Sequence, residues 1–76
     1  MNKIRRKALN EIYDKLAELR DLLEEVKGEE EDYRDNIPEN LQSSERYEKA
    51  DDACGQLEEA FEQLEYVLDC IEAAAE

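Results

Sequence analysis

The stretch DNIPENLQSS, residues 35–44, divides the chain into two long segments that both carry helical patterns. Pro38 cannot continue a helix interior, because its ring removes a backbone donor and disfavours helical geometry at Ile37. Ser43 or Ser44 is a good N-cap, since its side chain can accept from the free N–H groups of a first turn. Asn36 could likewise cap a short turn that begins at Pro38. The stretch therefore predicts that one helix ends here and another begins.

Apolar residues recur on both sides of this stretch at the alternating spacing of three and four that is typical of coiled coils. With Leu9 at position a of a heptad abcdefg, the a and d positions of the first segment are apolar except at Glu30. With Tyr47 at position a, every a and d position of the second segment is apolar as far as Ala75. The d positions of the first segment are Ile12, Leu19, Val26 and Tyr33, and all of them are expected in the core.

These patterns predict an all-α protein that folds as an antiparallel helical hairpin, a two-helix coiled coil. The expected elements are a helix over about 3–34, a turn over about 35–43 and a helix over about 44–75, in a single domain of residues 1–76. The e positions face each other in antiparallel pairs. They carry Tyr13, Arg20 and Lys27 in the first helix and only acidic residues in the second. This complementarity favours the antiparallel arrangement.

The g positions indicate an assembly of two hairpins. They are apolar throughout the second helix, so its apolar stripe is wider than a lone two-helix hairpin can bury. A homodimer in which two hairpins form a four-helix bundle would cover this stripe. The expected interface residues are Leu22, Ala53, Ala60, Val67 and Ala74.

The charge of the chain is strongly acidic and unevenly distributed. The net charge is −13, and residues 28–76 hold 3 basic and 17 acidic side chains, which gives them a net charge of −14. Such a surface repels nucleic acid and anionic membranes, so direct binding to either is not expected. A partner recruited by charge should be basic. The alternative interpretation is that the acidic residues only solvate long exposed helices.

The cysteines and the lack of histidine exclude several classes of site. There is no histidine, and the only cysteines are Cys54 and Cys70, so neither a disulfide framework nor a Cys/His zinc cluster is expected. Both should lie on one helix, about 24 Å apart at 1.5 Å per residue, which is too far for a bridge. Reduced thiols fit a cytoplasmic protein. No signal peptide and no membrane span are expected.

The acidic pairs raise one enzymatic alternative. All-α nucleotide pyrophosphohydrolases hold magnesium with Glu-x-x-Glu and Glu-x-x-Asp pairs, and Glu59-x-x-Glu62 and Glu29-x-x-Asp32 match these spacings. Magnesium needs several oxygens that converge on one point. In the heptad register, however, Glu59 and Glu62 face solvent. We therefore expect no catalysis, no metal, no cofactor and no small-molecule substrate.

The segment from Asp35 to Glu48 resembles the central segment of a group of small uncharacterised proteins. These come from phages, prophages and other mobile elements of Gram-positive bacteria, and they share the pattern Asn-x-Pro-Glu-x-Leu-Gln-x-Ser-Glu-Arg between two Glu-rich helices. The motif covers about a fifth of this chain. The resemblance implies an origin on a mobile element and a role in contact with host or defence machinery, but no activity.

The candidate contact residues are Glu39, Gln42 and Arg46 at the turn, with Tyr66 as an exposed aromatic on an acidic face. We expect Arg46 to pair with Glu39 or Asp35, and the basic run of residues 3–7 to pair with Glu72 and Glu76. The predicted function is a non-catalytic, acidic, homodimeric protein-interaction module. The alternative is a phage-type inhibitor that mimics nucleic acid and blocks a basic surface of a host or defence protein.

Overall fold

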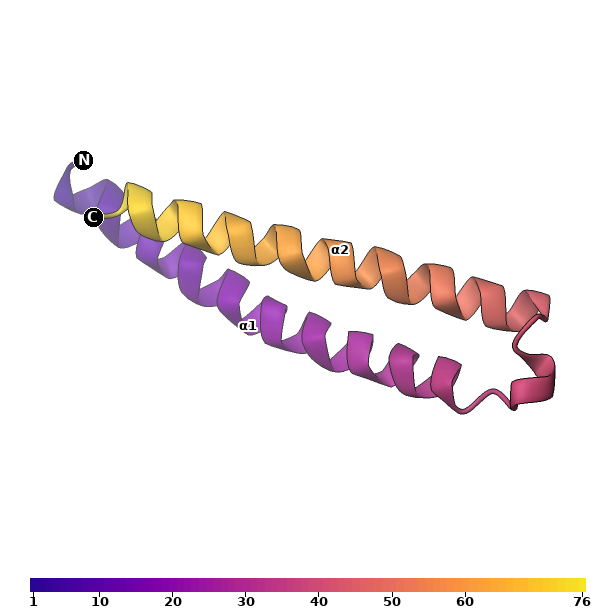
Figure 1. Ribbon diagram of the computed structural model, residues 1–76. Helices are drawn as coiled ribbons and strands as arrows, with labels where there is room; N and C mark the ends of the chain where they lie inside the picture. Colours follow the sequence, from indigo (N-terminus) through magenta and orange to yellow (C-terminus); the bar gives the residue numbers. More distant parts are fainter.

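The structure, a computed structural model, describes all 76 residues as two long helices folded back on each other (Figure 1). Helix α1 spans Lys3–Asp35 and helix α2 spans Glu45–Ala74, and a single 3-10 turn, η1, covers Glu39–Leu41 between them. The two chain termini lie together at the end opposite the turn (Figure 1). The molecule measures 59 × 15 × 13 Å. The predicted all-α antiparallel hairpin is confirmed.

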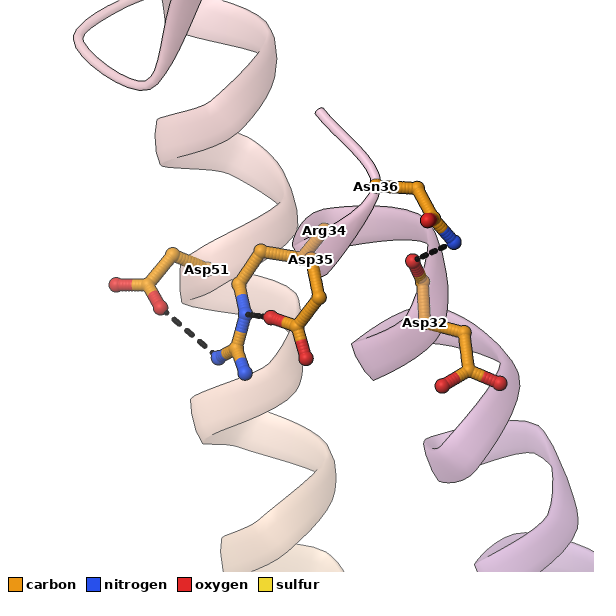
Figure 2. A network of polar contacts seen from close by, with 5 residues as sticks. All are labelled: Asp32, Arg34, Asp35, Asn36 and Asp51. Atoms are coloured by element: carbon orange, nitrogen blue, oxygen red, sulfur yellow. Dashed lines mark hydrogen bonds and ion pairs between the residues drawn. The ribbon is translucent and has the colours of Figure 1, made fainter. Parts of the chain in front are cut away.

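Short polar side chains cap the helices. The Asn2 side chain accepts a hydrogen bond from the Arg5 backbone N–H at 2.8 Å and starts α1. Ser44 accepts from the Tyr47 N–H at 3.3 Å and starts α2, so the cap is Ser44 and not Ser43. Asn36 behaves differently from the prediction, because its amide donates to the Asp32 carbonyl at 2.7 Å and closes the end of α1 (Figure 2). The residue before η1 is Pro38, whose ring has no hydrogen-bond acceptor, so η1 has no side-chain cap.

The core of the hairpin is small. Only Ile37, Ala50, Cys54 and Leu68 are buried, and Ile37 closes the core at the turn. Neither helix contains a stretch long and apolar enough to cross a membrane. Two helices with so few buried side chains gain little hydrophobic stabilisation.

Helix α1 is rotated about its axis relative to the predicted register. Its half-buried positions include Leu9, Leu16 and Leu23 at a, and Tyr13, Arg20 and Lys27 at e. The predicted core residues at d are instead exposed, by 47% at Ile12, 55% at Leu19 and 52% at Val26. The prediction that a and d together form the core of α1 is therefore wrong for d. In α2 the a and d positions do face α1, because every one of them is buried or half-buried.

Candidate protein-interaction surface

One long side of the hairpin is closed by three ion pairs between the helices, which we call the charged ladder. Its pairs are Arg20–Glu65 at 3.2 Å, Lys27–Glu58 at 2.9 Å and Arg34–Asp51 at 3.1 Å. Successive pairs are one heptad apart on both helices, as the antiparallel pairing of e positions requires. Each cation also contacts a carboxylate of its own helix, at Asp21, Glu31 and Asp35 respectively. Figure 2 shows Arg34 held between Asp35 and Asp51.

Lys27 is the centre of this ladder. Hydrogen bonds to Glu58 and Glu31 raise the pKa of the Lys27 ammonium, and the same hydrogen bond from Lys27 lowers the pKa of Glu58. The Lys27 Nζ atom also lies 5.8 Å from the centre of the Phe61 ring, within reach of a cation–π contact. The Lys27 side chain therefore covers apolar surface with its stem while its charge is satisfied.

The ladder explains the rotation of α1. Long cationic side chains at e can reach the carboxylates of α2 and also cover apolar surface there with their stems. Turning the e row towards α2 turns the d row away from it by the same angle. Arg20 and Lys27 of the ladder were predicted from the complementary e positions, whereas Arg34 and the exposure of the d row were missed. No residue of the first helix signalled this exposure, because the a row, which includes Glu30, faces α2 in both arrangements.

The opposite long side is apolar and uncovered, and we call it the open face. On a helix, residues two positions apart point about 200° apart, so Leu22 opposes Arg20, and Ala60 opposes Glu58. The exposed residues of the open face are Ile12, Leu19, Leu22, Val26 and Tyr33 from α1, and Ala60, Val67 and Ala74 from α2. Leu22 is 53% exposed and Val67 42%. Ala53, also expected at the interface, is half-buried at the edge of this face.

The total exposed surface is large for the mass. The chain exposes 5829 Å², although its mass is only 8.9 kDa. A compact monomer of this mass exposes about 4,800 Å², which leaves an excess of roughly 1,000 Å². A stable protein–protein interface buries about 800 Å² on each partner, so the excess is of the size that one such interface removes.

The tip of the hairpin carries the predicted contact residues Glu39, Gln42 and Arg46, all of them exposed. Glu39 begins η1, and Gln42 ends it, with its backbone N–H donating to the Glu39 carbonyl at 3.2 Å. The predicted ion pair of Arg46 with Glu39 or Asp35 is wrong. The Arg46 guanidinium instead lies over the Tyr33 ring, 5.6 Å from its centre, while Asp35 pairs with Arg34.

The remaining predicted residues lie far from the tip. Tyr66 is 66% exposed in the second half of α2, and the neighbouring Cys70 side chain raises its pKa. The structure therefore does not bring Tyr66 together with the residues of the turn. Cys54 is buried, and desolvation raises the pKa of its thiol.

The two ends of the chain meet through a hydrogen bond and not through the predicted ion pairs. The Arg6 Nε atom donates to the Ala75 carbonyl oxygen at 2.8 Å, and no cation of residues 3–7 forms an ion pair with Glu72 or Glu76. A cation at the carboxyl end of a helix also interacts favourably with the helix dipole. Arg6 therefore joins the two helix ends through backbone oxygen.

The acidic pairs considered for magnesium do not converge. Glu59 and Glu62 are exposed, as the heptad register predicts, and no group of three or more acidic or cysteine side chains is arranged to hold a metal ion. Comparisons with protein-family models, with curated proteins and with solved structures find no match to this chain. The two long sides and the tip of the hairpin are therefore its candidate contact surfaces.

Proposed function

We propose that the protein is a non-catalytic, acidic protein-interaction module that works as a homodimer, in which two hairpins pack through their open faces into a four-helix bundle. The observation that carries the proposal is the contrast between a side closed by ion pairs and a side that exposes Leu19, Leu22 and Val26 by more than half. Contiguous exposed apolar surface of this kind marks an interaction site in a soluble chain.

A second copy is the occupant that fits the open face best. The excess surface of roughly 1,000 Å² matches one partner's share of a stable interface. The face runs along both helices, so an equally long apolar partner is required, and another hairpin offers one. Packing of two hairpins would also turn a two-helix protein with four buried residues into a bundle with a continuous core.

Sedimentation equilibrium at micromolar concentration tests the assembly. We expect a species of twice the 8.9 kDa mass of one chain. A folded monomer that persists across the concentration range would contradict the proposal, provided that circular dichroism shows intact helices in the same sample.

The contact with other proteins is proposed to lie at the tip. Glu39 and Gln42 are exposed, and neither side chain forms a hydrogen bond or an ion pair within the chain. The resemblance of residues 35–48 to mobile-element proteins suggests a partner in host or defence machinery. Replacing Gln42 and Arg46 with Ala should leave the helical signal intact and weaken partner binding tenfold or more, about 1.4 kcal/mol. If partner binding is unchanged by the double substitution, the contact lies along the helices and not at the tip.

A second candidate function is inhibition of a basic, nucleic-acid-binding surface by charge mimicry. The outer surface of α1 around Gly28 favours it, because Asp21, Glu24 and Glu25 line a shallow depression there and only Asp21 has a cationic partner. Association driven by such a surface should weaken steeply with ionic strength. Nucleic acid should also displace the protein from its partner. Binding that is indifferent to both salt and nucleic acid would remove this candidate.

A further inference from the structure

The charges that border the open face select one of two ways in which the proposed homodimer can form. A twofold axis along the hairpin places both turns at the same end and sets α1 over α2 of the second copy. A twofold axis across the helices places the turns at opposite ends and sets α1 over α1 and α2 over α2. The two arrangements bring different border residues together.

After Ile4, the border row of α1 is entirely acidic. Glu18 and Glu25 lie four residues before and three residues after Leu22, so they flank the open face on the same surface of the helix. The row has one residue per heptad and consists of Ile4, Glu11, Glu18, Glu25 and Asp32, and all five are exposed.

The border row of α2 contains no acid. Gln56 and Gln63 lie four residues before Ala60 and Val67 and flank the open face there. The full row is Lys49, Gln56, Gln63 and Cys70, again all exposed. Lys49 contacts only Glu45 of its own helix, at 3.1 Å, and its side chain is 76% exposed. It is therefore available for a partner of opposite charge.

Packing with the turns at opposite ends would place the acidic row of α1 against the same row of the second copy. Eight carboxylates would then line one seam, and like charges in contact are destabilising. Lys15 and Glu29, which interrupt the open face on α1, could form two ion pairs in that arrangement. Two pairs between exposed groups do not offset a seam of eight carboxylates.

Packing with the turns at the same end places the acidic row against the row of Lys and Gln. The ladder pairs show which residues of α1 and α2 lie at the same position along the long axis of the hairpin. A twofold rotation about an axis parallel to the hairpin leaves each residue at its position along that axis. Asp32 then comes beside Lys49 of the second copy, to within one helical turn. One heptad further along, Glu25 comes beside Gln56 and then Glu18 beside Gln63, so three of the four carboxylates meet a Lys or Gln donor, while Glu11 comes beside Cys70.

The sizes of the apolar side chains favour the same arrangement. Helix α1 contributes large residues to the open face, such as Leu19 and Leu22, whereas α2 contributes mainly alanine, such as Ala60 and Ala74. Large side chains that face small ones interdigitate and fill a layer at even spacing. In the opposite-end arrangement large residues would meet large ones, and alanines would meet alanines.

We infer that the homodimer packs α1 of each copy over α2 of the other, with both turns at the same end of the bundle. The inference rests on the homodimer proposed above and deepens it. Its functional consequence is that Glu39, Gln42 and Arg46 of both copies lie side by side and present a paired tip to one partner.

Pulsed electron paramagnetic resonance on spin-labelled protein distinguishes the two arrangements. The labelled variant is Asn40→Cys with Cys70→Ser, which leaves the tip as the single exposed thiol, since Cys54 is buried. Helices in a bundle pack about 8–10 Å apart, so labels on two tips at the same end should lie within roughly 30 Å. Tips at opposite ends should be separated by close to the 59 Å length of the hairpin.

A matched label at the middle of the bundle shows whether the dimer forms at all, independently of its orientation. Glu59→Cys with Cys70→Ser places the label on an outward position halfway along α2. Its partner should lie within roughly 40 Å in either arrangement. A short distance at both sites supports the inference. A short distance at residue 59 with a long one at residue 40 overturns the orientation and keeps the dimer. No interlabel distance at either site overturns both.

An exchange of charges gives a second readout without labels. In the proposed arrangement Lys49→Glu should raise the dimer dissociation constant severalfold, because it places an acid beside Asp32, and a further Asp32→Lys should restore it. If the turns lay at opposite ends, Asp32→Lys would strengthen the dimer by relieving the acidic seam, and it would do so by the same factor in the natural chain and in Lys49→Glu. Sedimentation of the four proteins decides between these results.

Discussion

The two long sides of the hairpin differ in how their side chains are satisfied. On the ladder side, three cations of α1 reach carboxylates of α2, and the charges are neutralised within the chain. On the open side, aliphatic residues of both helices remain in water. Both sides carry heptad-spaced residues. Long cationic side chains can therefore complete their contacts within one chain, whereas a wide apolar stripe needs another surface to be buried.

The largest expected effect comes from placing a charge on the open face. Val67→Glu or Ala60→Glu should raise the dimer dissociation constant at least 100-fold, roughly 3 kcal/mol, because an unpaired carboxylate would be buried. Sedimentation equilibrium measures the change. The matched control is Glu59→Lys, next to Ala60 but on the outward face, and it should leave the dimer intact. Equal effects of Ala60→Glu and Glu59→Lys would show that charge in general, and not the open face, governs assembly.

A substitution that lies on neither the ladder side nor the open face, Gly28→Ala, tests the local stability of helix α1. Gly28 lies within α1, and an added Cβ would meet no atom within 4 Å. Gly28→Ala should raise the free energy of unfolding by about 1 kcal/mol, because alanine loses less backbone entropy in a helix than glycine does. Urea denaturation measures the gain. A loss of stability would mean that Gly28 has a role in packing or flexibility that its open surroundings do not indicate.

The ladder side should respond more weakly, because its ion pairs are partly in water. Lys27→Met keeps the stem that covers apolar surface and removes the charge that binds Glu58 and Glu31. We expect the melting temperature to fall by about 2–4 °C and the dimer dissociation constant to stay within twofold. Thermal melting and sedimentation of the same samples check both results. Loss of the dimer in this variant would show that the ladder side also contributes to assembly.

The smallest effect concerns pH at the ladder. Lys27 lowers the pKa of Glu58 from its ordinary 4.5, so the ionised carboxylate stabilises the folded state above that pH. The contribution is lost as the pH falls through the lower folded-state pKa, because the carboxyl is then protonated in both states. Glu58→Gln should therefore be less stable than the natural chain at pH 6 to 7, and the difference should shrink below about pH 4.5. A difference in melting temperature that is independent of pH would contradict this account.

The local features of this protein were determined by short-range sequence signals. Pro38 and the Ser44 cap predict where the turn lies, because both act on the backbone within a few residues. The heptads predict two helices, and the opposite charges at e predict that they run antiparallel. The helix bounds of 3–35 and 45–74 lie within a residue of those expected. Among the candidate contact residues, the exposure of Gln42 and Tyr66 agrees with their predicted solvent positions.

Only the tertiary structure decided which row of α1 meets α2. A heptad with apolar a and d and cationic e is compatible with either a/d or a/e packing, since the rows differ by a rotation of about 50° on the helix surface. The structure chooses a/e, because the stems and charges of Arg20, Lys27 and Arg34 are satisfied by α2 at the same time. It likewise decided that Arg46 lies over Tyr33 and that Arg6 binds a carbonyl. These contacts join residues that are far apart in the sequence and meet only after folding, so no short-range pattern encodes them.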